Sequence, residues 1–223
     1  MGKMSVQRHR PIREQVATIV RNAIIEQQFK AGQVLIEREL CEMTEASRAS
    51  VREAIRQLEA EGLVETQNGR GVVVTSLTPE MAKEVYEVRA ALEGLAARLF
   101  AHRANDDDRA ALKDAIDRLG AGVEGGWNAK RLLAAKKEIY DVLFHGARND
   151  VLRQQVESLQ HRVTQFRALT LSQKGRPAQT LQEMLNLLDA ITRRDESEAE
   201  KAAIHHVECA AAISLDSLTS TKP

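Results

Sequence analysis

Residues 47–55 read SRASVREAI, and they combine the start of a helix with two permanent positive charges. Ser47 is a favourable N-cap residue, and an apolar pattern with helical spacing follows it. Arg48 and Arg52 lie one turn apart on the same face. Because free N–H groups give a helix N-terminus a partial positive charge, a cation there is locally unfavourable. An anionic partner offsets this cost, although an arginine pair by itself is more often plain solvated surface.

The segments around this stretch predict a small helical unit that ends in a β-hairpin. A helix that begins at Pro11 and a short helix over residues 37–43 come before it, and the turn TEAS (44–47) leads into it. Beyond the helix, two runs rich in β-branched residues flank Asn68-Gly69, which is a strong hairpin signal. Two short helices joined by a tight turn and followed by a hairpin predict a winged helix-turn-helix.

The second helix of such a motif enters the major groove of DNA with its N-terminal residues against the base edges. In this position Arg48 and Arg52 reach phosphates and guanine edges. Arg70 lies beside the tip of the hairpin and approaches the DNA backbone or the minor groove. DNA is therefore the anionic partner that the arginine pair predicts.

The run over residues 37–74 resembles the winged-helix domain of the GntR family of bacterial transcriptional regulators. It carries the pattern S-R-x-x-V-R-E-A-x-x-x-L-E-x-E-G-L-V, followed by G-R-G and a strand. The resemblance implies DNA contacts from the first short helix, from the S-R-x-x-V-R run and from the wing tip. Together with the arginine beside that tip, the expected DNA-binding residues are Arg38, Ser47, Arg48, Ala49, Ser50, Arg52, Asn68, Gly69 and Arg70.

Three departures from the family pattern affect this domain. Ala49 and Ser50 stand where threonine and proline are common, which alters the expected base preference. Ile36 replaces a usual N-cap hydroxyl. The turn over residues 44–46, Thr-Glu-Ala, replaces a usual apolar-Gly-Val turn, so we expect it to be less well packed.

The rest of the chain predicts an all-helical bundle, so that the protein as a whole is mostly α. We expect a winged-helix domain over 1–76, a linker at 77–78, a helical domain over 79–218 and a disordered tail at 219–223. Thr78 and Pro79 suit the cap and first turn of a helix. Six helical segments are separated by Gly, Asn, Asp and Pro: 79–102, 106–120, 127–147, 150–172, 177–193 and 195–216.

Three stretches of this bundle resemble the FCD effector-binding domain, which the FadR-type branch of the GntR family carries. They are YEVRAALEGLAARLFAHRA (86–104), YDVLFHGARNDVL (140–152) and LLDAITRRDESEAEKAAIHHVE (187–208). Six helices resemble the shorter, VanR-like version of that domain.

The FCD pattern also implies a metal site. Asp141 and His145 are four residues apart and share a helix face, and the pattern adds a histidine on each of the last two helices. His206 retains one of these, but Met184 stands in the place of the other, and a thioether is a poor ligand for zinc or similar ions. Asp141, His145 and His206 either hold a divalent metal with water or an effector carboxylate, or are vestigial beside a metal-free pocket.

Arg89 and Met184 are the expected effector-binding residues. Arg89 matches a family position whose guanidinium faces the cavity, and an arginine there suits a small carboxylate effector through bidentate pairing. The alternative for Arg89 is an ion pair within its helix, to Glu93 at i+4. Met184 either packs against the effector or fills the space that a metal would occupy.

Composition narrows the function classes. Lys plus Arg and Asp plus Glu both number 32, so any contact with DNA must come from a local patch. Aromatic residues make up 3% of the chain, which disfavours a base-stacking surface. Cys41 and Cys209 have no metal-type spacing, and no apolar run approaches the roughly 18–20 residues of a membrane span. We expect a cytoplasmic protein without a membrane partner.

Two classes of function remain. The first is a ligand-responsive transcriptional regulator, for which the family resemblance implies repression that a small organic acid relieves. One short recognition helix reads few base pairs, so we expect a homodimer on a palindromic operator. The second is a metal-dependent hydrolase with an accessory winged helix. No H-E-x-x-H motif, phosphate-binding Gly loop or nucleophile elbow occurs in the sequence, and we therefore expect a regulator and not an enzyme.

Overall fold

The computed structural model describes residues 11–26 and 28–220. It divides the chain into two compact units, Met1–Ser76 and Leu77–Pro223. Residues 1–10 of the expected winged-helix domain and residues 221–223 of the expected tail lie outside the described residues. Over the described ranges, none of the helices has both the length and the apolar composition of a membrane-spanning segment.

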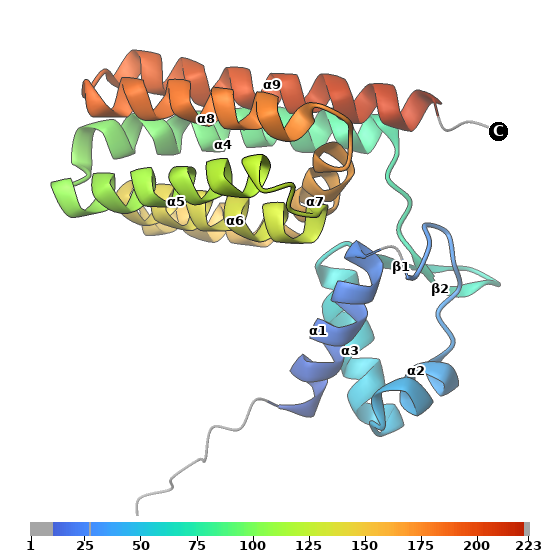
Figure 1. Cartoon of the computed structure of the whole chain (residues 1–223). Helices are drawn as coiled ribbons and strands as arrows, with labels where there is room; N and C mark the ends of the chain where they lie inside the picture. Colours follow the sequence, from blue (N-terminus) through green and yellow to red (C-terminus); the bar gives the residue numbers. More distant parts are fainter. Residues whose placement is uncertain (1–10, 27, 221–223) are drawn as a thin grey trace, which may run out of the picture. The chain divides into compact units, whose positions relative to one another are not determined.

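The first unit is a three-helix cluster with a β-hairpin (Figure 1). Its apolar core is formed by residues of α1, α3 and the hairpin, with Leu35 and Leu40 between them. This is the predicted winged helix-turn-helix. Its elements are α1 (Ile12–Ile25), α2 (Glu37–Thr44), α3 (Arg48–Ala60), β1 (Val64–Gln67) and β2 (Gly71–Val74).

Local capping sets the start of helix α3. The Ser47 side chain accepts a hydrogen bond from the backbone N–H of Ser50 at 3.2 Å, as predicted for an N-cap. Helix α2 has no such cap, because Ile36 occupies the N-cap position and has no side-chain acceptor.

The wing contains a third segment that the sequence pattern did not predict. β1 and β2 pair antiparallel, with Val64 opposite Val74. Val34 forms a bridge to Val73 on the other side of β2, and the Leu35 N–H donates to the Val72 carbonyl at 2.8 Å. Residues 33–35 therefore cover the free edge of β2 and tie the wing to the segment before α2.

The second unit is the predicted bundle of six helices, and no strand occurs in its described residues (Figure 1). Helix α4 packs most extensively against α9, and Gly94 makes this possible: a Cβ atom there would approach Ile204 Cγ1 to 2.9 Å. The six helices are α4 (Pro79–Arg103), α5 (Asp106–Glu124), α6 (Ala129–Gly146), α7 (Asp150–Leu171), α8 (Arg176–Thr192) and α9 (Glu196–Ser220).

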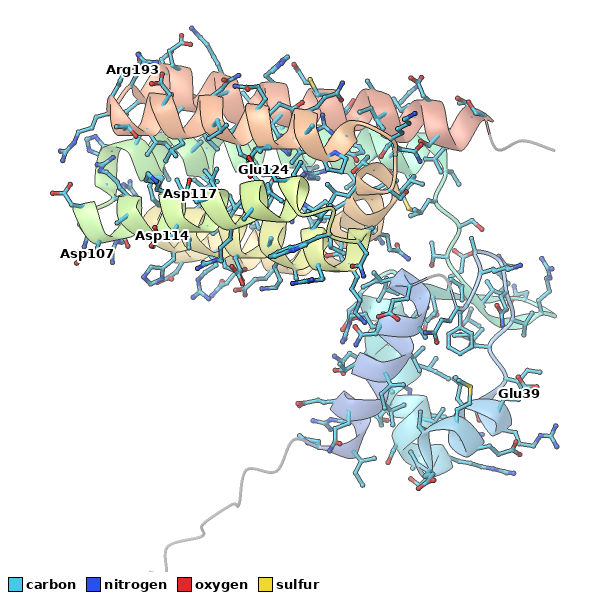
Figure 2. All side chains as sticks on the ribbon, viewed as in Figure 1. Glu39, Asp107, Asp114, Asp117, Glu124 and Arg193 are labelled. Atoms are coloured by element: carbon cyan, nitrogen blue, oxygen red, sulfur yellow. The ribbon has the colours of Figure 1, made fainter. Side chains whose placement is uncertain are left out.

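Helix α5 has one apolar face, which packs in the bundle, and one charged face, which is exposed. Its buried residues include Leu112, Ile116 and Leu119, which recur at helical spacing on one face. The acidic side chains of Asp107, Asp114, Asp117 and Glu124 are exposed on the remaining surface (Figure 2). The helix therefore contributes apolar contacts to the core and charge to the solvent side.

Two apolar cores in the second unit are separated by buried charged groups. On α4, the residues of one core precede Arg89 and those of the other follow Glu93. We call these buried groups the charged layer. It comprises the half-buried Glu183 and the buried Arg89, Glu93, Lys136, Arg167, Arg176 and His206.

The C-terminal end of the bundle differs from the prediction. Helix α9 continues through Ser220, so Thr219 and Ser220 are helical and not part of a disordered tail. The Thr219 hydroxyl donates to the carbonyl of Leu215, which keeps this last turn regular. Leu77, predicted as linker, packs against the apolar cluster that contains Tyr86.

The turn between α2 and α3 generates a stability prediction. Glu45 has a φ of 52°, in the left-handed region where a side chain is strained and glycine is not. Glu45→Gly should therefore raise the free energy of unfolding of the first unit by about 0.5–1 kcal/mol. Hydrogen exchange of peptides from residues 11–76 measures this change.

Glu42→Gly is the matched control, because Glu42 lies inside α2 with helical geometry. This variant should lose about 1 kcal/mol. A loss of stability in both variants would show that the Glu45 side chain contributes more than its backbone strain costs.

Candidate functional site

The N-terminus of α3 presents an unpaired arginine to solvent. Arg48 and Ala49 are exposed, and Arg48 forms no ion pair with any residue that the structure describes. The Ser47 and Ser50 hydroxyls lie 3.0 Å apart and also share the cap of the helix. Of the side chains at this helix start, Arg48 is therefore the one whose donors are available to a partner.

The other two predicted arginines of the helix-turn-helix are paired with carboxylates. Arg52 Nε donates to both oxygens of Glu37 at 3.0 Å, and Arg38 Nε lies 4.0 Å from Glu42. Both arginines remain largely exposed, so these pairs are weak and exchangeable. Residues 37–56 contain four arginines and five glutamates, which keeps the non-specific attraction to DNA small.

The wing tip is exposed at Asn68, Gly69 and Arg70. Gly69 has a φ of 80°, and the Arg70 N–H donates to the Gln67 carbonyl at 3.1 Å to close the turn. The Arg70 side chain forms no ion pair within the described residues. All nine predicted DNA-binding residues thus lie on α2, the α3 start or the wing tip, and all except the half-buried Ser50 are exposed.

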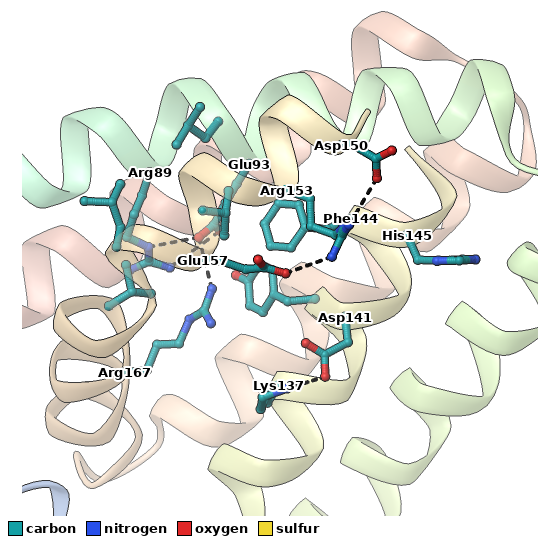
Figure 3. Close-up of a pocket in the computed structure, with 15 residues that line it drawn as sticks. Arg89, Glu93, Lys137, Asp141, Phe144, His145, Asp150, Arg153, Glu157 and Arg167 are labelled. Atoms are coloured by element: carbon teal, nitrogen blue, oxygen red, sulfur yellow. Dashed lines mark hydrogen bonds and ion pairs between the residues drawn. The ribbon is translucent and has the colours of Figure 1, made fainter. Parts of the chain in front are cut away.

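The second unit contains a cavity of about 500 Å³ between α4, α6 and α7. Apolar side chains cover much of its wall, including Leu92, Phe144, Val156, Leu159 and Val163. At its rim, Lys137 pairs with Asp141, and Arg153 pairs with Asp150 and Glu157 (Figure 3). The deeper polar groups of the wall are Arg89, Glu93 and Arg167.

A single carboxylate holds the two arginines of the cavity wall. Arg89 Nε donates to Glu93 Oε1 at 2.9 Å, and Arg167 Nη2 donates to the same oxygen at 3.0 Å (Figure 3). Both alternatives for Arg89 are therefore realised, because it pairs with Glu93 at i+4 and also lines the cavity. Burial opposes the ionised form of Glu93, but Arg89 and Arg167 outweigh it and lower the pKa of this carboxyl.

Lys136 is the most unusual group of the charged layer, and the sequence interpretation missed it. Its side chain is 1% exposed and forms no hydrogen bond or ion pair within the described residues. Burial, together with Arg167, Arg89 and Arg176, places the pKa of Lys136 well below its ordinary value. A sequence signal existed, because Lys136 lies at helical spacing among the apolar residues of α6.

The predicted metal ligands do not come together. Helix α6 turns Tyr140 and Leu143 into the core, so Asp141 and His145 are exposed toward α7. His206 is buried elsewhere, beside a separate cavity of about 10 Å³. No group of three or more His, Cys, Asp or Glu side chains in the described part of the chain is arranged to hold a metal ion. The residues present do not fit a zinc-like site.

Met184 and His206 line that small cavity together, and Met184 does not line the larger one. His206 Nδ1 lies 2.5 Å from Glu183 Oε2, and Arg176 donates to both oxygens of Glu183 at 2.6 and 2.8 Å. Burial and the nearby Lys136 lower the pKa of His206, so its imidazole is neutral and donates from Nδ1 to Glu183. Arg176 and Glu183 were also not identified from the sequence. These two residues are seven positions apart, and the other partner of Glu183, His206, lies on a different helix.

A winged helix with an exposed arginine at its recognition-helix start, followed in sequence by a helical domain, defines the class of two-domain DNA-binding transcriptional regulators. Residues 12–74 match the family described as "Bacterial regulatory proteins, gntR family", and residues 84–208 match the FCD domain. The chain belongs to the GntR family and carries an FCD domain.

Similar proteins agree with this assignment. The galactonate operon transcriptional repressor of Escherichia coli (strain K12) is 28% identical over 75% of this chain and 81% of its own length. The Glc operon transcriptional activator of the same strain is 29% identical over 89% and 87%. E. coli McbR/YncC has the same fold, with a TM-score of 0.77 at 19% identity over 93% of this chain and 99% of its own. The two relatives are named as transcriptional regulators, and the solved structure shares the fold.

Lys136 generates a prediction about stability and pH. Because its amine is buried without a partner, Lys136→Met should raise the free energy of unfolding by about 1–3 kcal/mol. The unfolded chain binds a proton at Lys136 up to its ordinary pKa of 10.5, whereas the folded chain releases it at lower pH. Stability of the unmodified protein therefore rises with pH within this window.

The variant lacks this dependence, so its advantage should shrink as the pH rises. Urea unfolding at about pH 6 and about pH 9 measures the difference, with the larger gain expected at the lower pH. A variant less stable than the unmodified protein at both values would show that Lys136 has a stabilising partner.

Proposed function

We propose that the protein is a homodimeric repressor whose operator binding is relieved by a small organic acid in the cavity of its FCD domain. The DNA-binding part of the proposal rests on one observation. Arg48, at the N-terminus of α3, is exposed and forms no ion pair within the described residues. Arginine at this position suits bidentate contact with a guanine edge.

The cavity supports the effector part of the proposal. Arg89 and Arg167 offer buried guanidinium groups to a ligand, and the apolar wall suits the body of a small acid. The name of the galactonate operon repressor supports repression, whereas the Glc operon protein is an activator. We favour repression because the resemblance to the FadR-type branch suggests it.

The competing proposal is an enzyme, and the charged layer argues against it. A hydrolase needs a general base or a metal-bound water in the cavity. Glu93, the buried carboxylate of the wall, is held ionised by two arginines and is therefore a weak base. His206 lies apart from Asp141 and His145, so these three expected ligands do not form a metal site.

The dimer and its operator are tested together. Sites selected from random duplexes and mapped by footprinting should be palindromic, with two half-sites about one helical turn apart. Gel filtration should give the mass of a dimer, and acids that raise the unfolding temperature should release the DNA. A monomer that protects an asymmetric site, or DNA binding that no carboxylic acid alters, would each remove one part of the proposal.

Arg48→Ala should lose about 1–3 kcal/mol of operator binding and relax base preference at one position of each half-site. Fluorescence anisotropy with the selected operator and with single-base variants measures both effects. Arg56→Ala is the control, since Arg56 lies two turns further along α3 and pairs with Glu53. A uniform loss across all sequences would assign Arg48 to phosphate and not to a base.

A further inference from the structure

Residues 14–76 of the first unit carry a net negative charge, which opposes an approach to DNA. They contain seven lysines and arginines, ten glutamates and no aspartate, so their net charge is −3. Attraction to DNA comes from cations that contact phosphates and release condensed counterions. The winged helix over these residues therefore has little long-range attraction to DNA of its own.

Ion pairs within the unit reduce this attraction further. Four of the seven cations have a glutamate partner, and the pairs are Arg21–Glu61, Arg38–Glu42, Arg52–Glu37 and Arg56–Glu53. The other three, Lys30, Arg48 and Arg70, are exposed and form no ion pair within the described residues. Of the cations described between residues 14 and 76, three are thus available to phosphates without the loss of an ion pair.

The stretch that precedes Glu14 supplies the missing positive charge. Residues 3–13 read KMSVQRHRPIR, and we call them the basic segment. Residues 11–13 of this segment are described by the structure, whereas residues 3–10 are not. The segment has no acidic residue, and its cations are Lys3, Arg8, Arg10 and Arg13. With these four included, the net charge of residues 1–76 is +1.

The basic segment joins the first unit at the end where α3 begins. Helices α1 and α3 pack against each other and run in the same direction (Figure 1). Arg21 pairs with Glu61 at 2.6 Å, near the C-terminal ends of both helices. Because both helices rise equally per residue, Ile12 and Arg52, each nine residues earlier, lie near the same level. The chain therefore enters the unit beside the end that presents Arg48.

Arg13 is the described cation of the basic segment, and its position favours an anionic partner. It is exposed in the first turn of α1 and forms no ion pair within the described residues. A cation there lies against the partial positive charge of the helix N-terminus, which is locally unfavourable. Arg48 has the same position on α3. A phosphate backbone along this end of the unit would offset the cost at both helix starts.

We propose that the basic segment is a second DNA-contacting element, which binds backbone phosphates beside the half-site that α3 reads. This inference rests on the proposed DNA-binding function and adds a contact outside the nine predicted residues. Residues 3–10 can reach up to about 26 Å from Pro11, which exceeds the half turn of DNA, about 17 Å, between successive grooves. Arginine and lysine bind phosphates without reading the base sequence.

The experiment removes the charge and keeps the length of the chain. The charge variant combines Lys3→Gln, Arg8→Gln, Arg10→Gln and Arg13→Gln in the full chain. Fluorescence anisotropy with the selected operator measures its affinity over a range of salt concentrations. At about 0.15 M salt the affinity should fall by about tenfold or more. Each lost phosphate contact reduces the slope of log K against log salt by about 0.9, so four per protomer reduce it by about 3–4.

Base preference and the position of the contacts distinguish this segment from α3. The ratio of affinities for the operator and its single-base variants should change by less than about twofold in the charge variant, in contrast to Arg48→Ala. Ethylation of the phosphates that flank each half-site should interfere with binding of the unmodified protein and not with binding of the charge variant.

The matched control removes four exposed cations of the second unit, each of which has an acidic partner. It combines Lys113→Gln, Arg118→Gln, Arg193→Gln and Lys201→Gln. The net charge of the chain changes by the same amount, and exposed ion pairs of this kind contribute little to stability. Because salt screens distant charges, operator affinity should change by less than about threefold.

Unchanged affinity and salt slope in the charge variant would overturn the inference, as would an equal loss in the control variant. A loss that depends on the bases flanking the half-site would overturn the assignment to phosphates. In each of these cases the proposed function stands, because the unmodified protein still binds its operator. Failure of the unmodified protein to select any duplex sequence would instead overturn both.

Discussion

One carboxylate, Glu93, balances two buried guanidinium groups, and the arrangement of the second unit depends on it. Arg89 and Arg167 come from helices α4 and α7, so their shared contact with Glu93 joins helices that are far apart in sequence. An isolated buried charge is strongly unfavourable, and loss of this carboxylate would leave two of them. The large cavity lies beside this contact, and all three side chains line it.

The features that could be predicted from the sequence are formed by contacts between residues that are close together along the chain. Ser47 caps α3 through Ser50, three residues away, and Asn68-Gly69 closes the hairpin between adjacent strands. The family pattern added the positions of the predicted DNA-binding residues, which lie on α2, at the start of α3 and at the wing tip. The sequence also identified the turn at 44–46 as a departure from the family pattern, and the structure adds that Glu45 there has a φ of 52°.

Features that the sequence failed to predict depend on contacts between distant segments. Val34 pairs with Val73, and no local signal in residues 33–35 identifies that partner. The spacing of Asp141 and His145 shows that they share a face, but not which helix that face meets, nor that His206 lies beside a different cavity. The sequence shows Lys136 as a charged residue on an apolar helix face. The lowered pKa of its amine, however, depends on its burial and on three arginines from other helices.

Tyr140 and Glu93 line both the large cavity and the small one beside Met184 and His206. The aromatic ring is thus a partition between two spaces, held in place by the Arg167 guanidinium 3.6 Å from its centroid. A smaller residue at this one position would join the two spaces and lengthen the room for a ligand's body while the anchoring cations remain. Under the proposed function, substitution of Tyr140 alone would change the chain length of the acid that the cavity accepts, while the residues predicted to contact DNA stay the same.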